Sequence, residues 1–191
     1  PPAHLENGAW IARAGNLRKV VHVVAGGRHR QESVWNGLNA FRKPPRLVLV
    51  HDAVRPLVRR RVIDDVIRQA RVHGAAVAGV KVKETIKLEG AKGFFTRTLD
   101  RTKLWSIQTP QGFDFRLLYA AHKKAREAGF MGTDDASLVE RSGGKAYLGI
   151  PLLEAFSRTL PTDSNAPQTA GLSSEGTRSS PEERAFPGSQ L

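Results

Sequence analysis

Three polar side chains follow directly after a short apolar run and could do chemistry together. The run is Leu47–Val50, and His51, Asp52 and Arg55 come next. A carboxylate and a guanidinium that emerge from one strand end can hold a metal ion and a phosphate. In open α/β sheets, ligands bind outside the carboxyl ends of the strands, where these residues would lie. A simpler interpretation, and the more common one for an arbitrary strand end, is that Asp52 caps a turn and pairs with Arg55.

The elements that position these side chains follow from the spacing of apolar residues. The run Leu47–Val50 is too short for a helix and rich in β-branched residues, which is typical of a strand buried on both faces of a parallel sheet. Similar runs predict strands at 19–25, 75–82, 104–110 and 145–148. Helical spacing predicts a helix at 59–73 and another that begins at Asp114, its N-cap, and ends at Gly129. Two more helices are predicted, one after the Gly26–Gly27 turn and one after Thr133. A weaker helical pattern over 1–18 would turn inward Leu5, Ala9, Ile11, Ala12 and Leu17.

Two helix starts carry residues of interest. The Gly26–Gly27 turn would present free backbone N–H groups to an anion or an acceptor-rich base, although most such turns simply permit positive φ. Thr133 would cap its helix, with Asp134 and Asp135 in the first turn, where the helix dipole favours negative charge. Without a ligand, the same pattern is only a favourable helix start.

The segment 82–99 interrupts the alternation of strands and helices. It contains two roughly alternating runs on either side of Gly90–Gly93, which predicts a β-hairpin. A hairpin inserted in an α/β domain has little core of its own. We therefore expect it to pack on a second subunit.

Composition limits the classes of protein. The chain has 191 residues, 40% of them hydrophobic, which is enough for one domain with a core. It has no cysteine, so disulfides and thiolate chemistry are excluded, and no apolar run approaches the roughly 20 residues of a membrane span. No leader opens the chain, so we expect a cytoplasmic protein, or a plastid protein if the source is a eukaryote. The chain begins with Pro-Pro rather than Met, as a fragment would.

The net charge of +12 points to an anionic ligand. A basic RNA-binding protein is one interpretation, but no nucleic-acid motif is present and aromatic residues make up only 7% of the chain. A phosphorylated small substrate explains the charge equally well. Residues 151–191 differ from the rest, because nearly half are Pro, Gly, Ser or Thr. We expect one domain over 1–150 and a disordered tail after it.

Four stretches together resemble one enzyme family. They are Val23–Val34 (VVAGGRHRQESV), Val48–Pro56 (VLVHDAVRP), Asp100–Gln111 (DRTKLWSIQTPQ) and Thr133–Ser137 (TDDAS). Over about residues 1–149 the chain resembles the 2-C-methyl-D-erythritol 4-phosphate cytidylyltransferases of the non-mevalonate isoprenoid pathway. The related ribitol-phosphate cytidylyltransferases share the motifs at 51–56 and 108–111, whereas Arg101 and Trp105 favour the methylerythritol branch.

The resemblance implies a fold and a reaction. The fold is an α/β, Rossmann-like nucleotidyltransferase three-layer sandwich with a β-hairpin dimerisation arm at about 82–100. The reaction joins CTP and the sugar phosphate into a CDP-sugar alcohol and releases pyrophosphate, with Mg²⁺ as cofactor. The implied partners are these two substrates and a second copy of the chain, with neither nucleic acid nor membrane.

The resemblance also implies roles for particular residues. Asp52 would bind Mg²⁺ and, with Arg55, form the catalytic strand end, while Gly27 and Ser33 would lie beside the cytidine. The sugar phosphate would be held by Thr85, Arg101, Thr109 and Thr133, the first two reaching over from the partner subunit.

The family pattern also includes segments that we do not find in this sequence. A Gly-rich loop with an arginine and a lysine would precede Pro1, and an Asn-Ile-Lys stretch would follow Tyr147. We therefore expect this polypeptide to form essentially no CDP-alcohol and to bind phosphate-bearing ligands weakly. Relative to an intact enzyme, it should bind methylerythritol phosphate better than CTP. The alternatives are an inactive remnant that dimerises or binds phosphate, or a ribitol-phosphate cytidylyltransferase.

Overall fold

The computed structural model describes residues 5–151, and the tail predicted beyond them lies outside the described residues. The α-helices are α1 (Leu5–Ala14), α2 (Arg30–Asn39), α3 (Arg60–His73), α4 (Phe115–Glu127) and α5 (Asp135–Arg141). The strands are β1 (Leu47–Val50), β2 (Ala75–Lys81), β3 (Lys87–Glu89), β4 (Phe95–Thr98), β5 (Trp105–Asp114) and β6 (Tyr147–Pro151). Two short 3-10 helices, η2 (Ala91–Gly93) and η3 (Arg101–Lys103), complete the elements. Among the described residues, no helix is both long and apolar enough to cross a membrane.

The main sheet has the strand order β1-β5-β2-β6. Strand β5 runs antiparallel to both β1 and β2, and β6 runs parallel to β2. The predicted α/β class is confirmed, but the prediction that β1 lies in a parallel sheet, buried on both faces, is wrong. Within residues 5–151, β1 pairs only with the antiparallel β5, and all four of its residues are half-buried. An apolar run alone does not reveal the direction of the neighbouring strand.

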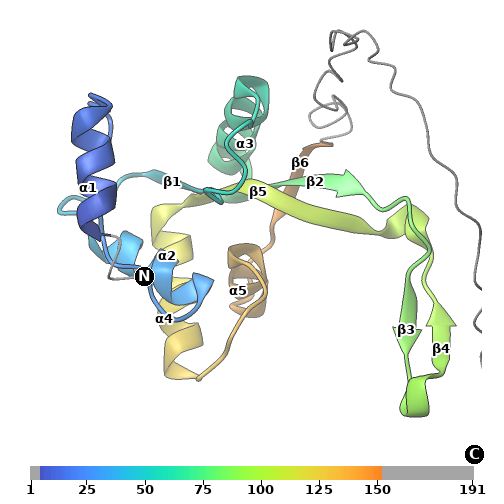
Figure 1. Ribbon diagram of the computed structural model, residues 1–191. Coiled ribbons are helices and arrows are strands. Elements are labelled where there is room, and N and C mark those ends of the chain that lie inside the picture. Colours follow the sequence, from blue (N-terminus) through green and yellow to red (C-terminus); the bar gives the residue numbers. More distant parts are fainter. Residues whose placement is uncertain (1–4, 152–191) are drawn as a thin grey trace, which may run out of the picture. The chain divides into compact units, whose positions relative to one another are not determined.

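Helices cover both faces of this sheet, as Figure 1 shows: α3 lies on one side, and α2, α4 and α5 lie on the other. The larger core cluster fills the side of α4 and α5, with Phe113, Leu118 and Leu138 among its buried members. A smaller cluster on the α3 side contains Val62, Val66 and Ala78. The result is the predicted three-layer arrangement.

Local chemistry explains where the helices begin, end and pack. The Asp114 carboxylate accepts hydrogen bonds from the first backbone N–H groups of α4, as predicted for an N-cap. Gly74 ends α3 with φ of 82°, a conformation that favours glycine. Gly112 lets α3 approach the sheet, because a Cβ at this position would lie 2.8 Å from Cγ1 of Val66.

Two predictions for the first part of the chain are wrong. Residues 19–25 do not form a strand, and their valines remain exposed, Val21 at 82%. A strand needs a partner, and within residues 5–151 nothing pairs with the outer edge of β1; instead a cleft of about 490 Å³ separates β1 from residues 19–24. Helix α1 does form, but it buries no residue, and Ile11 and Leu17 are exposed rather than inward.

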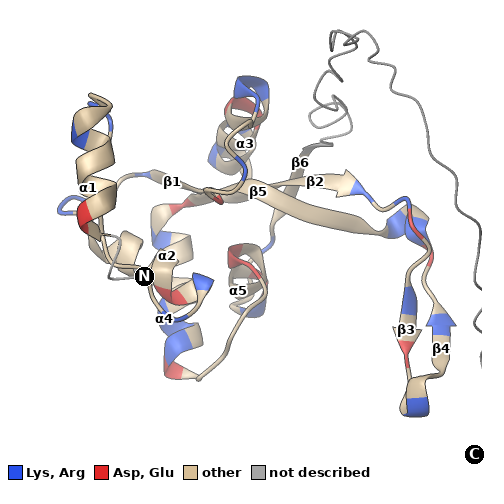
Figure 2. Ribbon diagram, viewed as in Figure 1, with Lys and Arg blue, Asp and Glu red and all other residues tan. Residues whose placement is uncertain are grey.

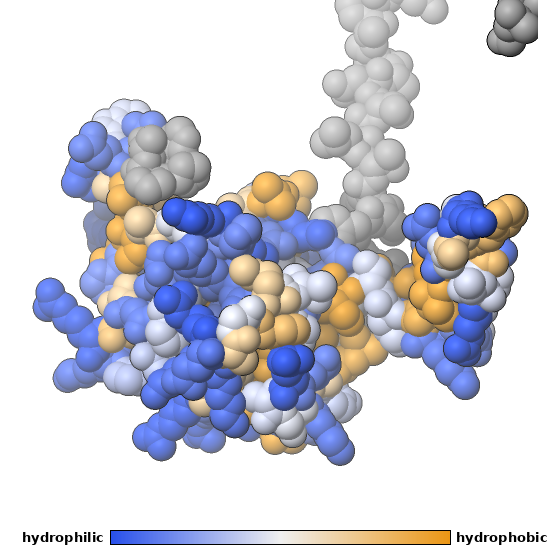
Figure 3. All heavy atoms as spheres, turned by 90° about the horizontal axis from the view of Figure 1, so that it is seen from below, coloured by the Kyte–Doolittle hydropathy of each residue, from blue (hydrophilic) through white to orange (hydrophobic). Residues whose placement is uncertain are grey.

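The hairpin forms as predicted, with β3 and β4 antiparallel and separate from the main sheet. All seven of its strand residues are exposed. Phe94 and Phe95 are 74% and 66% exposed, and Leu88 is exposed beside them. Figure 3 shows apolar surface on this arm among hydrophilic side chains. Within the described chain the hairpin therefore has no core of its own.

Candidate active site

The loop after β1 places Asp52 and Arg55 side by side. The Arg55 backbone N–H donates to the Asp52 carbonyl oxygen at 3.0 Å, which closes a turn. His51 Nε2 lies 2.9 Å from the Arg55 carbonyl oxygen, and this contact fastens the same turn from outside. The simpler interpretation of this motif is thus correct as far as it goes, because a turn and an Asp–Arg pair are both present.

The Asp52 carboxylate faces a different arginine with each of its oxygens. Arg30 Nε donates to Oδ1 at 3.2 Å, and Arg55 Nε lies 3.6 Å from Oδ2, beyond hydrogen-bond length. The Asp52 side chain is 31% exposed, so a ligand can reach it. Its backbone N–H donates to Oγ1 of Thr109 at 3.1 Å, which ties the loop to β5. The structure therefore brings together three of the predicted site residues, Asp52, Arg55 and Thr109.

Two buried residues continue this group into the core. Arg30 Nη1 lies 2.6 Å from Asp135 Oδ2, and Asp135 Oδ1 lies 2.9 Å from His122 Nε2. Asp135 is 1% exposed and His122 0%. Burial works against the charge of Arg30, but the Asp135 and Asp52 carboxylates outweigh it and raise the pKa of Arg30 above its ordinary value. Arg30 is a fixed cation between two carboxylates.

The start of α5 differs from the prediction. Its N-cap is Asp134, not Thr133: the Asp134 carboxylate accepts from the Ser137 N–H, and the Ser137 hydroxyl completes a capping box. Both Thr and Asp are good caps, so the sequence alone could not choose between neighbours. The side-chain amide of Gln111 donates to Asp134 at 2.8 Å and joins α5 to β5.

The glycine turn before α2 is already satisfied from within the chain. The Gly27 N–H donates to Ser33 Oγ at 2.9 Å, and the Arg28 N–H donates to the Glu32 carboxylate at 2.8 Å. The prediction that this turn offers free N–H groups is wrong for these two residues, because side chains of the first turn of α2 occupy them. The same hydrogen bond joins Gly27 to Ser33, and their place beside the cytidine stays a prediction.

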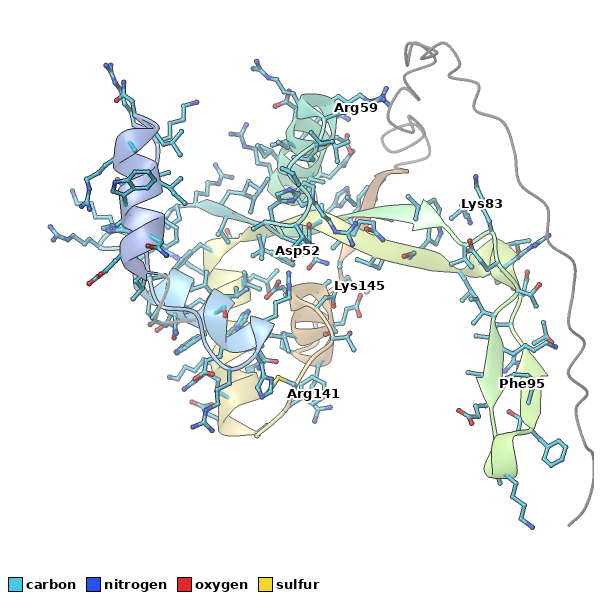
Figure 4. The ribbon with its side chains drawn as sticks, viewed as in Figure 1. Asp52, Arg59, Lys83, Phe95, Arg141 and Lys145 are labelled. Carbon is cyan, nitrogen blue, oxygen red and sulfur yellow. The ribbon has the colours of Figure 1, made fainter. Side chains whose placement is uncertain are left out.

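The remaining predicted residues lie apart from Asp52. Thr85 and Arg101 are exposed at the base of the hairpin, where the Arg101 guanidinium donates to the Lys83 carbonyl oxygen at 2.7 Å. Strand β5 leads from this base to Thr109, and its four steps from Trp105 to Thr109 span about 13 Å. Figure 4 shows Lys83 at the hairpin base, well away from Asp52. Within residues 5–151, no hydrogen bond or ion pair joins Thr85 or Arg101 to the Asp52 group.

Thr133 is exposed and lines a separate cleft of about 470 Å³. Trp105, Ile107 and Glu140 line the same cleft. It therefore lies between the hairpin end of β5 and the start of α5. Among residues 5–151, no hydrogen bond or ion pair joins Thr133 to Asp52, and Thr133 instead shares this cleft with Trp105 at the hairpin end of β5.

Charge around these groups suits an anionic ligand. Figure 2 shows Lys and Arg on α1, α3, α4 and the hairpin, while the strands of the main sheet carry few charges. Two buried guanidinium nitrogens beside Asp52, Arg30 Nη2 and Arg55 Nε, have no hydrogen-bond partner among the described residues. Buried donors without acceptors are rare in folded proteins, and oxygens of a phosphate would satisfy them.

Metal binding by this chain would depend on a ligand. Within residues 5–151, no cluster of three or more His, Cys, Asp or Glu side chains could hold a metal ion by itself. Asp52 has one oxygen, Oδ2, that accepts no hydrogen bond from the described residues. A single carboxylate fits Mg²⁺ when substrate phosphates and water supply the other ligands.

Sequence reasoning missed Arg30, Asp135 and His122 as members of this site. Arg30 and Asp135 lie inside quoted motifs, but nothing in their local pattern shows that they meet. The one available signal was chemical, since an acidic residue in the buried half of a helix needs a cationic partner.

Comparison with known proteins identifies what this arrangement is similar to. Residues 6–163 match the family model described as IspD, 2-C-methyl-D-erythritol 4-phosphate cytidylyltransferase. A protein of that name from Clostridium novyi is 48% identical over 138 residues, which cover 72% of this chain and 59% of the relative. A namesake from Symbiobacterium thermophilum is 46% identical over 157 residues, covering 81% of this chain and 66% of the relative. The chain thus spans less than two thirds of the length of these curated relatives.

This chain is also similar to solved structures. The crystal structure of 2-C-methyl-D-erythritol 4-phosphate cytidylyltransferase from Thermus thermophilus has a TM-score of 0.62 and 38% sequence identity. The alignment covers 73% of this chain and 68% of that one. The 4-diphosphocytidyl-2C-methyl-D-erythritol synthase from Anaerococcus prevotii has a TM-score of 0.65 and 31% identity, over 71% of this chain and 64% of its own.

Proposed function

Since the chain belongs to the 2-C-methyl-D-erythritol 4-phosphate cytidylyltransferase family, we propose that it serves cytidylyl transfer from CTP to 2-C-methyl-D-erythritol 4-phosphate in isoprenoid precursor synthesis. The observation that carries the proposal is the Asp52 carboxylate between two guanidinium groups at the end of β1. A carboxylate beside cationic donors that lack acceptors suits a metal-bound phosphate better than it suits a structural ion pair alone.

The reaction needs charge neutralisation more than acid–base chemistry. A phosphate oxygen of methylerythritol phosphate forms a bond to the α-phosphorus of CTP while the bond from that phosphorus to pyrophosphate breaks. Negative charge gathers on the leaving pyrophosphate and on the oxygens around the α-phosphorus. Arg55 and Arg30 would donate to these oxygens, and their fixed positions mean that little reorganisation is needed during the reaction.

Magnesium would be held by Asp52 together with the phosphates of CTP. When bound, the ion withdraws electron density from the phosphoryl oxygens and fixes the triphosphate in place. The chain's part is to present Oδ2 of Asp52 to the ion while Oδ1 stays bonded to Arg30. The Thr109 hydroxyl holds the Asp52 backbone, so the whole loop is fixed relative to β5.

The methylerythritol phosphate would be held partly by a second copy of the chain. Arg101 and Thr85 lie at the base of the exposed hairpin, too far along β5 to reach Asp52 of their own subunit. The apolar hairpin residues are the kind of surface that a homodimer buries. We propose that the two hairpins pack in a dimer and that each brings Arg101 and Thr85 to the other subunit's Thr109 and Thr133.

Calorimetric titration of CTP with and without Mg²⁺ tests the role of Asp52. We expect Mg²⁺ to raise the CTP affinity of the wild-type chain, and Asp52→Asn to abolish this increase while binding metal-free CTP as before. Asp64→Asn is the matched control, because Asp64 is an exposed carboxylate on α3 paired with Arg60. An equal effect of Mg²⁺ on the wild type and on Asp52→Asn would contradict the proposal.

A further inference from the structure

A continuous chain of charged and polar groups leads from the proposed metal ligand into the core. Asp52 Oδ1 accepts from Arg30 Nε at 3.2 Å, Arg30 Nη1 lies 2.6 Å from Asp135, and Asp135 lies 2.9 Å from His122. The two outer side chains, Asp52 and Arg30, are 31% and 35% exposed, whereas the two inner ones, Asp135 and His122, are 1% and 0% exposed. The outer end is open to ligands, and the inner end is immobilised by packing.

The inner end is fixed by three helices. Arg30 is the first residue of α2, Asp135 is the first residue of α5, and His122 lies in the middle of α4. His122 Nε2 lies within hydrogen-bond distance of Asp135 Oδ1, at 2.9 Å, and both side chains are buried. The His122 ring also stacks on Trp35 of α2, at 6.4 Å between centroids. Asp135 is therefore buried between His122 and Arg30, and the Arg30 contact with Asp135 is shorter than the Arg30 contact with Asp52.

We infer that Arg30 is a positioning residue for Asp52: anchored on the buried Asp135, it holds Oδ1 of Asp52 and leaves Oδ2 directed at the metal bound with the nucleotide. Asp52 lies outside any helix or strand, and its one side-chain hydrogen bond among the described residues is the one from Arg30, since Arg55 Nε lies 3.6 Å from Oδ2. The planar guanidinium can serve two carboxylates at once through Nε and Nη1. A lysine ammonium at the same place is a point charge that lacks this fork.

This inference deepens the proposed function, because it rests on Asp52 being the metal ligand. Hydrogen-bonded partners of metal-ligating side chains typically contribute about 10- to 100-fold to metal affinity. Arg30→Lys keeps the net charge and the cation beside Asp135, so a loss of affinity in this variant reports orientation rather than electrostatics. We expect the half-saturating concentration of metal–nucleotide to rise by about tenfold.

The experiment uses the preformed Mn²⁺·CTP complex as probe and the paramagnetic broadening of the Ala53 and Val54 amide signals as readout. The wild-type chain, Arg30→Lys, Asp52→Asn and the control Arg28→Lys are titrated under the same conditions. Arg28 is exposed two residues before Arg30, and within residues 5–151 its side chain makes no ion pair with a carboxylate. Thermal melting of each variant shows that it is folded.

The outcomes separate the two claims. Broadening that persists unchanged in Asp52→Asn overturns the proposed metal ligand itself. Broadening that is lost in Asp52→Asn but has a wild-type midpoint, or a lower one, in Arg30→Lys overturns only the positioning role. Should Arg30→Lys fail to fold, Asp135→Asn supplies the test, because it retains the guanidinium and removes its anchor. A raised midpoint in Asp135→Asn supports the inference, and an unchanged midpoint refutes it.

Discussion

The apolar tip of the hairpin gives the most quantitative prediction. Phe94 and Phe95 are 74% and 66% exposed, and a phenylalanine side chain buries about 200 Å² when covered. The two rings thus offer about 280 Å² per subunit, worth at most ~7 kcal/mol at about 25 cal/mol per Å². Only part of such area becomes affinity, because association has its own entropic cost. A quarter of this burial free energy, about 1.8 kcal/mol, already corresponds to a roughly 20-fold change in the dimer dissociation constant.

We therefore expect the double variant Phe94→Ser/Phe95→Ser to raise that dissociation constant by at least about 20-fold. The free energy of unfolding of the monomer should stay the same, since neither ring contributes to the core clusters. Sedimentation equilibrium over a range of concentrations measures the first quantity, and chemical denaturation measures the second. Val72→Ser is the control, because Val72 is 70% exposed but lies on α3. An unchanged dissociation constant in the double variant, or an equal change in the control, would refute the reasoning.

Three further changes test the local structure of the site. Thr109→Val removes the acceptor of the Asp52 N–H and should lower the free energy of unfolding by about 1–3 kcal/mol in urea titrations, whereas Thr109→Ser should not. Asp134→Ala removes the N-cap of α5 and should cost about 1–2 kcal/mol in the same assay; a loss below a few tenths would contradict the capping role. The Thr102 hydroxyl and N–H lower the pKa of Asp100 from its ordinary 3.8. This contribution to stability is present above pH 3.8 and is lost as the pH falls through the lowered pKa, so Thr102→Val should move the NMR-detected pKa back toward 3.8.

Much of the framework could be predicted because its causes are local. A run of four apolar residues, an aspartate before a helix and a glycine after one predict β1, the start of α4 and the end of α3. The hairpin was also predictable from nearby residues alone, because neither of its strands buries a residue against the rest of the described chain. These features need no knowledge of what lies elsewhere in the chain.

The errors concern features that depend on distant residues. Residues 19–25 have the composition of a strand, but a strand forms only beside another, and the described chain supplies none on that side of β1. The antiparallel pairing of β1 with β5 depends on a segment more than fifty residues further along. The pairing of Arg30 with Asp135 likewise depends on a residue far along the chain. In the candidate site, the residue types were predictable from their motifs, whereas the links between the motifs were not.

The most direct test of the account is a calorimetric titration of the chain with 2-C-methyl-D-erythritol 4-phosphate. We expect saturable binding with one site per subunit, at least about tenfold weaker in Arg101→Gln because that change removes a charge-assisted bidentate donor. Arg97→Gln, an equal charge change on the exposed β4, should bind like the wild type. Inorganic phosphate and ribitol 5-phosphate should both bind more weakly than methylerythritol phosphate. Absence of saturable binding, or equal affinity in the wild type and Arg101→Gln, would contradict the account.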